Sequence, residues 1–155
     1  MDLGMQLQIE ALCTRTVNHY AIAVGERDHQ GFAELFTEDG VWQRPGQKAM
    51  SGRAEIKAFM DRVEPDTLIR HVNGSIRVDV VDLDNARVIS NTTVYNCEKY
   101  VEGIAPMGGP DYVVEYRDIM RRVGSQFLIA RRDTRVVFRA DYAAGLPGLP
   151  STRKA

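Results

Sequence analysis

Cysteine is scarce in this chain of 155 residues, which has only Cys13 and Cys97. They form no Cys-x-x-Cys pair and no metal-ligand spacing, and two thiols are too few for a disulfide scaffold in a domain of this length. The sequence also lacks the run of about 18 apolar residues that a membrane-spanning helix requires. No apolar segment preceded by basic residues, as in a signal peptide, is found either. We therefore expect a cytoplasmic protein that neither enters a membrane nor is secreted.

An excess of charge of one sign is absent as well, because 20 Lys and Arg residues face 21 Asp and Glu residues. This balance implies no nucleic-acid or anionic-membrane partner. The motifs of a P-loop, a dinucleotide-binding turn and a zinc protease are missing, and His19 and His29 have no metal-ligand spacing with His71. We expect neither a cofactor nor a metal. What is present is an ordinary 44% of hydrophobic residues, enough for the core of one domain.

Apolar residues near the N-terminus recur at steps of three and four, the spacing of one buried face of a helix. The positions are Ile9, Leu12, Cys13, Val17, Tyr20, Ala21 and Val24. Gly25 stands where the C-terminal cap of this helix is expected. Asp28 is placed to cap a second, shorter helix, whose apolar face is Phe32, Leu35 and Phe36.

The next segment predicts a turn at 37–40 and a short strand at 41–44 that contains the only tryptophan, Trp42. Ser51 can cap a third helix, which Pro65 closes. The inward positions of this helix are Ile56, Phe59, Met60 and Val63. Three helices therefore precede the main sheet.

The rest of the chain is rich in the residues that strands favour. Strands are expected at 67–82, 86–100, 112–123 and 126–139, and short turns between them predict antiparallel hairpins. The Gly- and Pro-rich segment 101–111 is either a lid or a long hairpin loop. Helices followed by a meander predict one α+β domain over 1–139, with the helices on one face of the sheet. Residues 140–155 are expected to form a flexible tail or a clasp on a neighbouring subunit.

One histidine lies in the middle of a strand-like run. Alternation of apolar and polar residues from Ile76 onward would place His71 on the polar face. The tripeptide at 73–75 contains Gly74, however, and glycine within a strand often marks a bulge, which reverses the side-chain phase. A bulge there would turn His71 inward, where an imidazole can act as a general base. The alternative is a hydrogen-bonded structural or surface histidine.

Four stretches, in their order and spacing, resemble one family across nearly the whole chain. They are NHYAIAVGERDHQGFAELFTEDGVW from Asn18, MSGRAEIKAFM from Met50, RHVNGSIRVDV from Arg70 and EYRDIMRRVGSQFLIARRDTRV from Glu115. The chain is similar here to the SnoaL-like branch of the NTF2-like superfamily, which includes scytalone dehydratase, polyketide cyclases and gamma-hexachlorocyclohexane dehydrochlorinase. The resemblance implies an NTF2-like cone: a strongly curved, mostly antiparallel sheet round an apolar pocket, closed by the helices. It also implies a homo-dimer or homo-trimer formed through the outer face of the sheet.

Dehydratases and dehydrochlorinases of this family resemble one another in an aspartate near the end of the first helix that is paired with a strand histidine. His71 matches the histidine, whereas Gly25 stands at the position of the aspartate. Asp28, three residues further on, is a candidate for the missing carboxylate or simply a helix cap. Tyr20, on the buried face of the first helix, could bind a substrate carbonyl or be a core residue with an internal partner.

Further residues are candidates for the pocket wall, each with a plain core or surface role as the alternative. Trp42 matches a family position that lines the pocket, and Phe59 and Met60 follow from helical spacing. On the strands, either Asn91 with Tyr95 or Tyr116 with Asp118 could point inward. Arg131 and Arg132 are adjacent and should face opposite sides, and we assign Arg131 to the pocket, where it would bind an anion.

The resemblance and the residues together favour a small cofactor-independent lyase or isomerase, similar to a dehydratase or cyclase, acting on a hydrophobic small molecule. His71 is the expected base, with Tyr20 and Asp28 beside it. The alternative is a non-catalytic ligand-binding module, or a structural subunit resembling the small subunit of ring-hydroxylating dioxygenases, because Gly25 replaces the family aspartate.

Overall fold

The computed structural model describes residues 1–141, so the predicted tail lies outside the described residues apart from its first two positions. The described part contains three helices and six strands in one sheet. In chain order they are α1 (Leu3–Glu26), α2 (His29–Glu34), β1 (Phe36–Gln43), β2 (Met50–Ser51), α3 (Gly52–Met60), β3 (Leu68–Val80), β4 (Asn85–Cys97), β5 (Tyr112–Val123) and β6 (Gln126–Arg139). The predicted α+β class and helical layer are confirmed.

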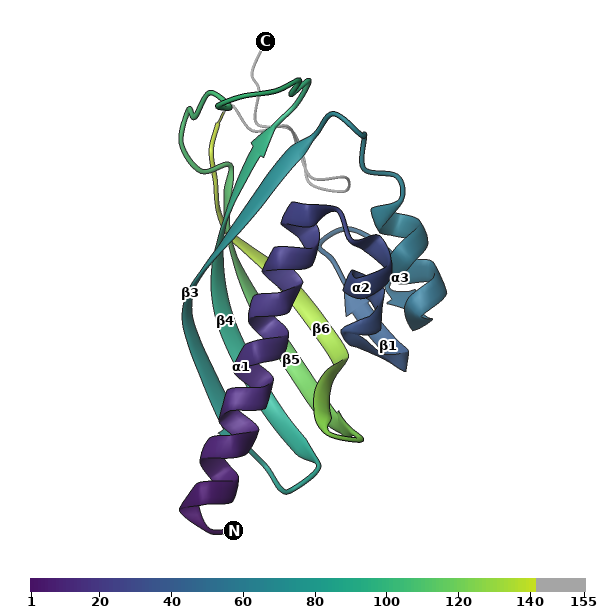
Figure 1. The fold of residues 1–155 in the computed structure, drawn as a ribbon, viewed down its shortest axis with the longest axis vertical. Helices are drawn as coiled ribbons and strands as arrows, with labels where there is room; N and C mark the ends of the chain where they lie inside the picture. Colours follow the sequence, from purple (N-terminus) through teal and green to yellow (C-terminus); the bar gives the residue numbers. More distant parts are fainter. Residues whose placement is uncertain (142–155) are drawn as a thin grey trace.

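The sheet has the strand order β2-β1-β6-β5-β4-β3 and is open at both edges. Consecutive strands from β3 to β6 pair antiparallel, as the turn signals predict. β1 pairs with β6 in parallel, with Trp42 opposite Arg132. Figure 1 shows the long α1 lying across one face of the curved sheet, with α2 and α3 beside its C-terminal half and next to β1.

The first helix is longer than predicted at both ends. Asp2 caps its start, since its carboxylate accepts a hydrogen bond of 2.9 Å from the backbone N–H of Met5. The expected cap at Gly25 is wrong, because the helix continues through Gly25 to Glu26 and Arg27 adopts the left-handed conformation (φ 59°). The Arg27 guanidinium donates to backbone carbonyls of the segment after α3, Val63 at 2.9 Å and Glu64 at 3.0 Å, and these bonds hold the strained residue in place.

Around α2 the predictions hold in part. Asp28 caps this helix as predicted, accepting a 2.8 Å hydrogen bond from the N–H of Gly31. The expected turn at 37–40 is instead the first half of β1, which has an irregular register between Phe36 and Val41. A Cβ at Gly40 would lie 2.9 Å from the Cβ of Phe36, so the backbone is too crowded there for any other residue.

Of the two possibilities that the sequence left open for β3, the structure has the bulge. Asn73 pairs with Thr92 and Ile76 with Ser90, so two residues of β3 face one residue of β4. The extra residue brings the side chains of His71 and Ile69 to the same face as Ile76 further along the strand.

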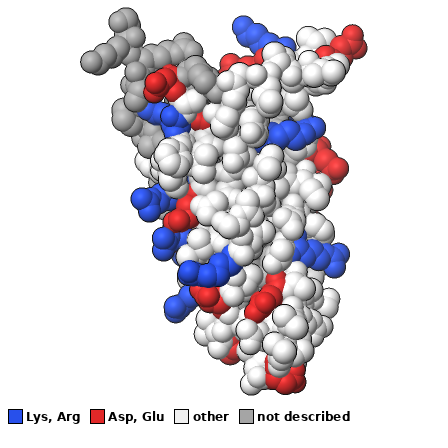
Figure 2. All heavy atoms as spheres, turned by 90° about the vertical axis from the view of Figure 1, so that its left-hand side faces the viewer, with Lys and Arg blue, Asp and Glu red and all other residues white. Residues whose placement is uncertain are grey.

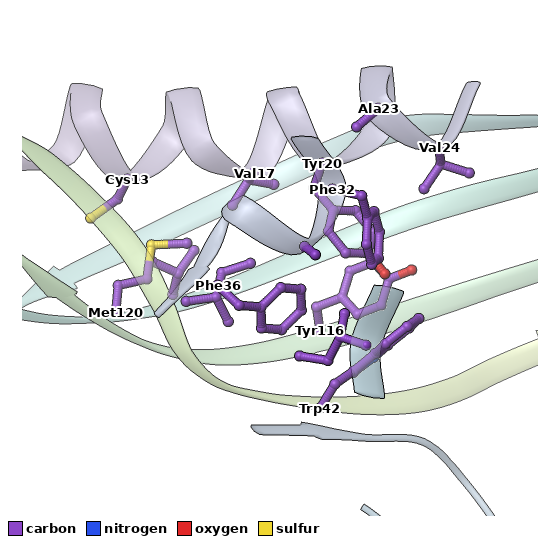
Figure 3. Close-up of a cluster of buried hydrophobic side chains, with 14 of the residues drawn as sticks. Cys13, Val17, Tyr20, Ala23, Val24, Phe32, Phe36, Trp42, Tyr116 and Met120 are labelled. Carbon is purple, nitrogen blue, oxygen red and sulfur yellow. The ribbon is translucent and has the colours of Figure 1, made fainter. Parts of the chain in front are cut away.

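The core lies between α1 and the inner face of the sheet. Figure 3 shows side chains from α1, α2, β1 and β5 meeting there, among them Tyr20, Phe32, Trp42 and Tyr116. Cys13 is fully buried in this core, and burial raises the pKa of its thiol to about 12, so it stays protonated. Both cysteines of the described part are free thiols.

The outside of the molecule carries charges of both signs. Figure 2, which faces the β3 edge, shows basic and acidic side chains interspersed over this face. Among residues 1–141, no helix is both long and apolar enough to cross a bilayer.

Candidate active site

A cavity of about 600 Å³ opens between the C-terminal half of α1, α3 and the inner face of the sheet. Its wall is mostly aromatic and aliphatic, with basic residues but no Asp or Glu among the described residues that line it. The lining residues are Tyr20, Val24, Trp42, Arg44, Gln47, Phe59, Met60, Arg62, Val63, Ile69, His71, Val94, Asn96, Tyr112, Val114, Tyr116 and Thr134. A concave, largely apolar space with a few polar groups is the usual form of a small-molecule site.

His71 reaches this cavity from β3 because of the bulge. Its ring stacks on the ring of Tyr20, with centroids 5.9 Å apart and planes 19° from parallel. The Nδ1 atom of His71 is buried and has no hydrogen-bond partner among the described residues. The imidazole is therefore held by ring packing, and one of its nitrogens is uncommitted.

The surroundings of His71 favour its neutral form. Burial, together with the positive charges of Arg132 and Arg44, lowers the pKa of His71 from 6.5 to about 4. At neutral pH the side chain is thus an uncharged imidazole with a free lone pair.

Two tyrosines share the inner wall with His71. The ring centroids of Tyr20 and Tyr116 are 5.5 Å apart, and Figure 3 shows the two side chains converging beneath α1. The Cζ of Arg132 lies 4.0 Å from the Tyr20 centroid and 4.1 Å from the Tyr116 centroid. Burial raises the pKa of both phenols, against the opposing charge of Arg132, so both stay protonated and can donate hydrogen bonds.

Arg132 is itself held by a buried ion pair. Its Nε and Nη2 donate to the two carboxylate oxygens of Asp118 at 2.8 and 2.6 Å, and both side chains are fully buried. The third guanidinium nitrogen, Nη1, has no hydrogen-bond partner among residues 1–141. The pair places a fixed positive charge directly behind the two phenols.

The structure brings most of the predicted site residues together. His71, Tyr20, Trp42, Phe59, Met60 and Tyr116 all line the cavity. Of the two candidate strand pairs, Tyr116 and Asp118 point inward. Asn91 instead donates to the hydroxyl of Ser75 in an exposed contact, and Tyr95, which shares its phase, is not part of the cavity wall.

Two more of the predicted site residues also lie outside the cavity. The carboxylate of Asp28 is committed to the cap of α2 and does not line the cavity. Arg131 points away from the core and forms an exposed ion pair with Asp133 at 2.7 Å, so Arg132 is the arginine on the inner side. The alternation argument correctly placed the two arginines on opposite sides, but we assigned the wrong one to the interior.

Among residues 1–141, no carboxylate lines the cavity in place of the family aspartate. A Cβ at Gly25 would lie 3.2 Å from Nη1 of Arg70, whose guanidinium donates to the carbonyl of Gly25 at 2.8 Å. Sequence reasoning also missed Arg44, Arg62, Tyr112 and Thr134 as cavity residues, since three of them lie at strand ends or in a loop where periodicity gives no direction. Among the described residues, no cluster of three His, Cys, Asp or Glu side chains could hold a metal ion.

An open curved sheet with helices over one face is the arrangement of NTF2-like proteins. One such protein, from Novosphingobium aromaticivorans, superposes on this chain with a TM-score of 0.72. The superposition covers 85% of this chain and 84% of that protein, at 24% sequence identity. The family model described as a SnoaL-like domain matches residues 5–133, and the chain belongs to this family. No curated protein matches the sequence significantly.

Two further solved structures share the fold. A protein from Novosphingobium aromaticivorans assigned as a scytalone dehydratase superposes with a TM-score of 0.80 over 99% of this chain and 100% of its own, at 20% identity. A hexachlorocyclohexane dehydrochlorinase superposes with a TM-score of 0.71 over 94% and 98% of the two chains, at 13% identity. At these identities the likeness shows a shared fold.

Proposed function

We propose that this protein is a lyase or isomerase that removes a proton from a carbon atom of a hydrophobic small molecule, with His71 as the base. The observation that carries the proposal is the position of a neutral, uncommitted imidazole against two protonated tyrosines in one apolar cavity. The steps below need only side chains of this chain. Membership of a family that includes dehydratases and cyclases supports the same chemistry.

The first step is enolisation of a carbonyl compound. The C–H bond next to the carbonyl breaks, the proton moves to the lone pair of His71, and the bonding electrons move to the carbonyl oxygen. Tyr20 donates a hydrogen bond to that oxygen as its negative charge develops, while Tyr116 donates to the hydroxyl of Tyr20 and supports it. The charge of Arg132 lies 4.0 Å behind Tyr20 and favours the same enolate, although it disfavours the imidazolium.

The second step returns the electron pair to carbon. Reprotonation at a different carbon gives an isomerase, and expulsion of a leaving group from the neighbouring carbon gives a lyase. In either case the proton on His71 goes back to the product or to the leaving group, so the base is regenerated.

The test is hydrogen exchange of a hydrophobic ketone. We would incubate 2-tetralone with the protein in D₂O and follow loss of its C1 proton signal by NMR. His71→Gln should reduce the protein-catalysed rate by about 100-fold, the size of a typical general-base contribution. His19→Gln, which changes an exposed histidine of α1, is the matched control and should keep the wild-type rate.

A non-catalytic ligand-binding role is the second candidate. The observation in its favour is that no carboxylate of the described residues lines the cavity beside His71, and the pKa of about 4 makes this histidine a weak base. If 2-tetralone binds to the wild-type protein but exchanges no faster than in buffer, proton abstraction is refuted and the binding role takes its place. The further alternative, a structural subunit of an oxygenase, predicts co-purification with a large iron-containing partner.

A further inference from the structure

Arg44 follows β1 and folds back over the aromatic wall of the cavity. Its Cζ lies 4.5 Å from the ring centroid of Phe59 and 5.3 Å from that of Trp42, so two rings hold the guanidinium at the cavity surface. Arg62 lies two residues after the end of α3, and its Cζ is 5.1 Å from the centroid of the same Phe59 ring. Two cations thus line the same cavity.

Neither cation has an acidic partner among residues 1–141. By contrast, Arg132 behind the wall is paired with Asp118. Asp111, an acid near the strand that carries Tyr112, accepts a 2.7 Å hydrogen bond from the backbone N–H of Asn96 and does not line the cavity. The half-buried Arg44 is therefore a cation whose charge the described protein does not balance.

The cost of this arrangement is visible at Arg44. Burial lowers the pKa of its guanidinium from the ordinary 12.5, which reflects lost hydration without a compensating carboxylate. A cation–π contact offsets only part of that loss. An anion that enters the cavity would provide the missing partner.

We propose that the substrate carries a carboxylate on a hydrophobic, ring-containing body, and that Arg44 binds this carboxylate while Arg62 adds a second, more exposed positive charge. The planar guanidinium matches a carboxylate through two parallel hydrogen bonds, and its fixed position on Trp42 and Phe59 reduces the entropy lost on binding. The body of the ligand would lie on the apolar wall that leads to His71. This inference rests on the proposed function in one respect, namely that the substrate binds in this cavity.

The test compares two probes of the same shape, 1-naphthaleneacetate and the neutral 1-naphthaleneacetamide. Isothermal titration calorimetry with the wild-type protein should give an affinity about tenfold or more higher for the carboxylate, which corresponds to about 1.4 kcal/mol. Arg44→Met, which keeps an apolar chain over the rings, should reduce this preference to about twofold or less. Arg44→Lys should restore part of the preference, because it keeps the charge but loses the fork.

Arg77→Met is the matched control, since it removes one positive charge from the exposed outer face of β3. It should keep the wild-type preference, and circular dichroism would verify that every variant is folded. Equal affinities of the two probes for the wild-type protein, no binding of the carboxylate, or an unchanged preference in Arg44→Met would each overturn the inference. Proton abstraction by His71 is tested separately with an uncharged ketone, so the two proposals fail independently.

Discussion

At the scale of single residues, the site is defined by a histidine that has no carboxylate beside it among residues 1–141. The neighbours of His71 are a tyrosine ring and positive charges, which together keep it neutral at physiological pH. The same positive charges would stabilise an enolate. The residue therefore suits a substrate whose C–H bond is already acidic, because the base itself is weak.

This environment makes stability depend on pH. The pKa of His71 is about 4 in the folded protein and 6.5 in the unfolded chain, so between these values the unfolded state binds more protons. The contribution of His71 to the free energy of unfolding therefore decreases as the pH falls below 6.5, and most of it is lost by pH 4. At pH 5 the decrease amounts to about 2 kcal/mol. Urea unfolding at pH 7.5 and pH 5 measures it.

His71→Gln is the control for this effect, because it removes the titrating group while the carboxylates of the protein remain. The difference in unfolding free energy between the two pH values should be smaller in the variant by about 2 kcal/mol. An equal difference in both proteins would show that His71 is solvated and titrates normally.

Gly25 offers a way to add the missing carboxylate. Its backbone is helical, so a side chain is tolerated there once the Arg70 guanidinium moves by a few tenths of an ångström. Gly25→Asp places a negative charge next to the strand residue before His71, and we expect the pKa of His71 to rise by about one unit or more. NMR titration of the imidazole ring protons gives the value.

Gly25→Asn has nearly the same shape without the charge and serves as the control for Gly25→Asp. If both variants give the same pKa for His71, the new carboxylate is paired with Arg70 instead, and the aspartate–histidine pair of the family is not restored. A rise in Gly25→Asp alone, together with faster exchange of 2-tetralone, would show that the cavity is competent for a stronger base.

At the scale of elements, strands β5 and β6 are joined by the buried pair of Asp118 and Arg132, which are direct cross-strand partners. Asp118→Asn would leave a buried guanidinium without its carboxylate, and we expect a loss of about 3–5 kcal/mol in the free energy of unfolding. Asp133 follows Arg132 in β6 and forms an exposed ion pair with Arg131. Asp133→Asn breaks this pair and should lower the free energy of unfolding by about 1 kcal/mol or less. Chemical denaturation of the two variants compares them directly.

A small effect of Asp118→Asn, similar to that of Asp133→Asn, would contradict this reading of the pair. Asp118→Asn should also affect binding in the cavity. Since Arg132 lies between Tyr20 and Tyr116, a displaced guanidinium should also weaken binding in the cavity.

Several elements could be predicted from the sequence because local patterns determine them. Strands β5 and β6 have the predicted bounds, and the glycine-containing tripeptide at 73–75 marked the place of the bulge that turns His71 inward. The C-terminal end of α1 could not be predicted, because Arg27 takes the left-handed cap position through contacts with residues 36 to 40 positions away. Such distant partners leave no local signal.

At the scale of the whole molecule, the order of elements and the family resemblance were sufficient for the fold class. They did not indicate that β1 pairs in parallel with β6, nor that Arg44 folds back over Trp42 and Phe59, since both depend on segments far apart in the chain. The phase of β4 also required the structure, because either face of an isolated strand could have pointed inward. Assembly into a dimer or trimer through the outer sheet face stays a prediction.

The place of β6 between β1 and β5 has a consequence for the order in which the protein can form during synthesis. β1 can pair with its parallel partner only after the segment around Ile129 has been synthesised. The hydroxyl of Thr16 in α1 donates to the carbonyl of Phe127 at 2.6 Å, so this hydrogen bond also forms only then. Until then α1 can pack on β3, but α2 and β1 are not joined to the sheet, and their exposed aromatic surface favours aggregation. A chain that ends before Gln126 would therefore contain all three helices and five of the six strands of the described part, but β1 would be separated from β5 and the cavity wall would be incomplete.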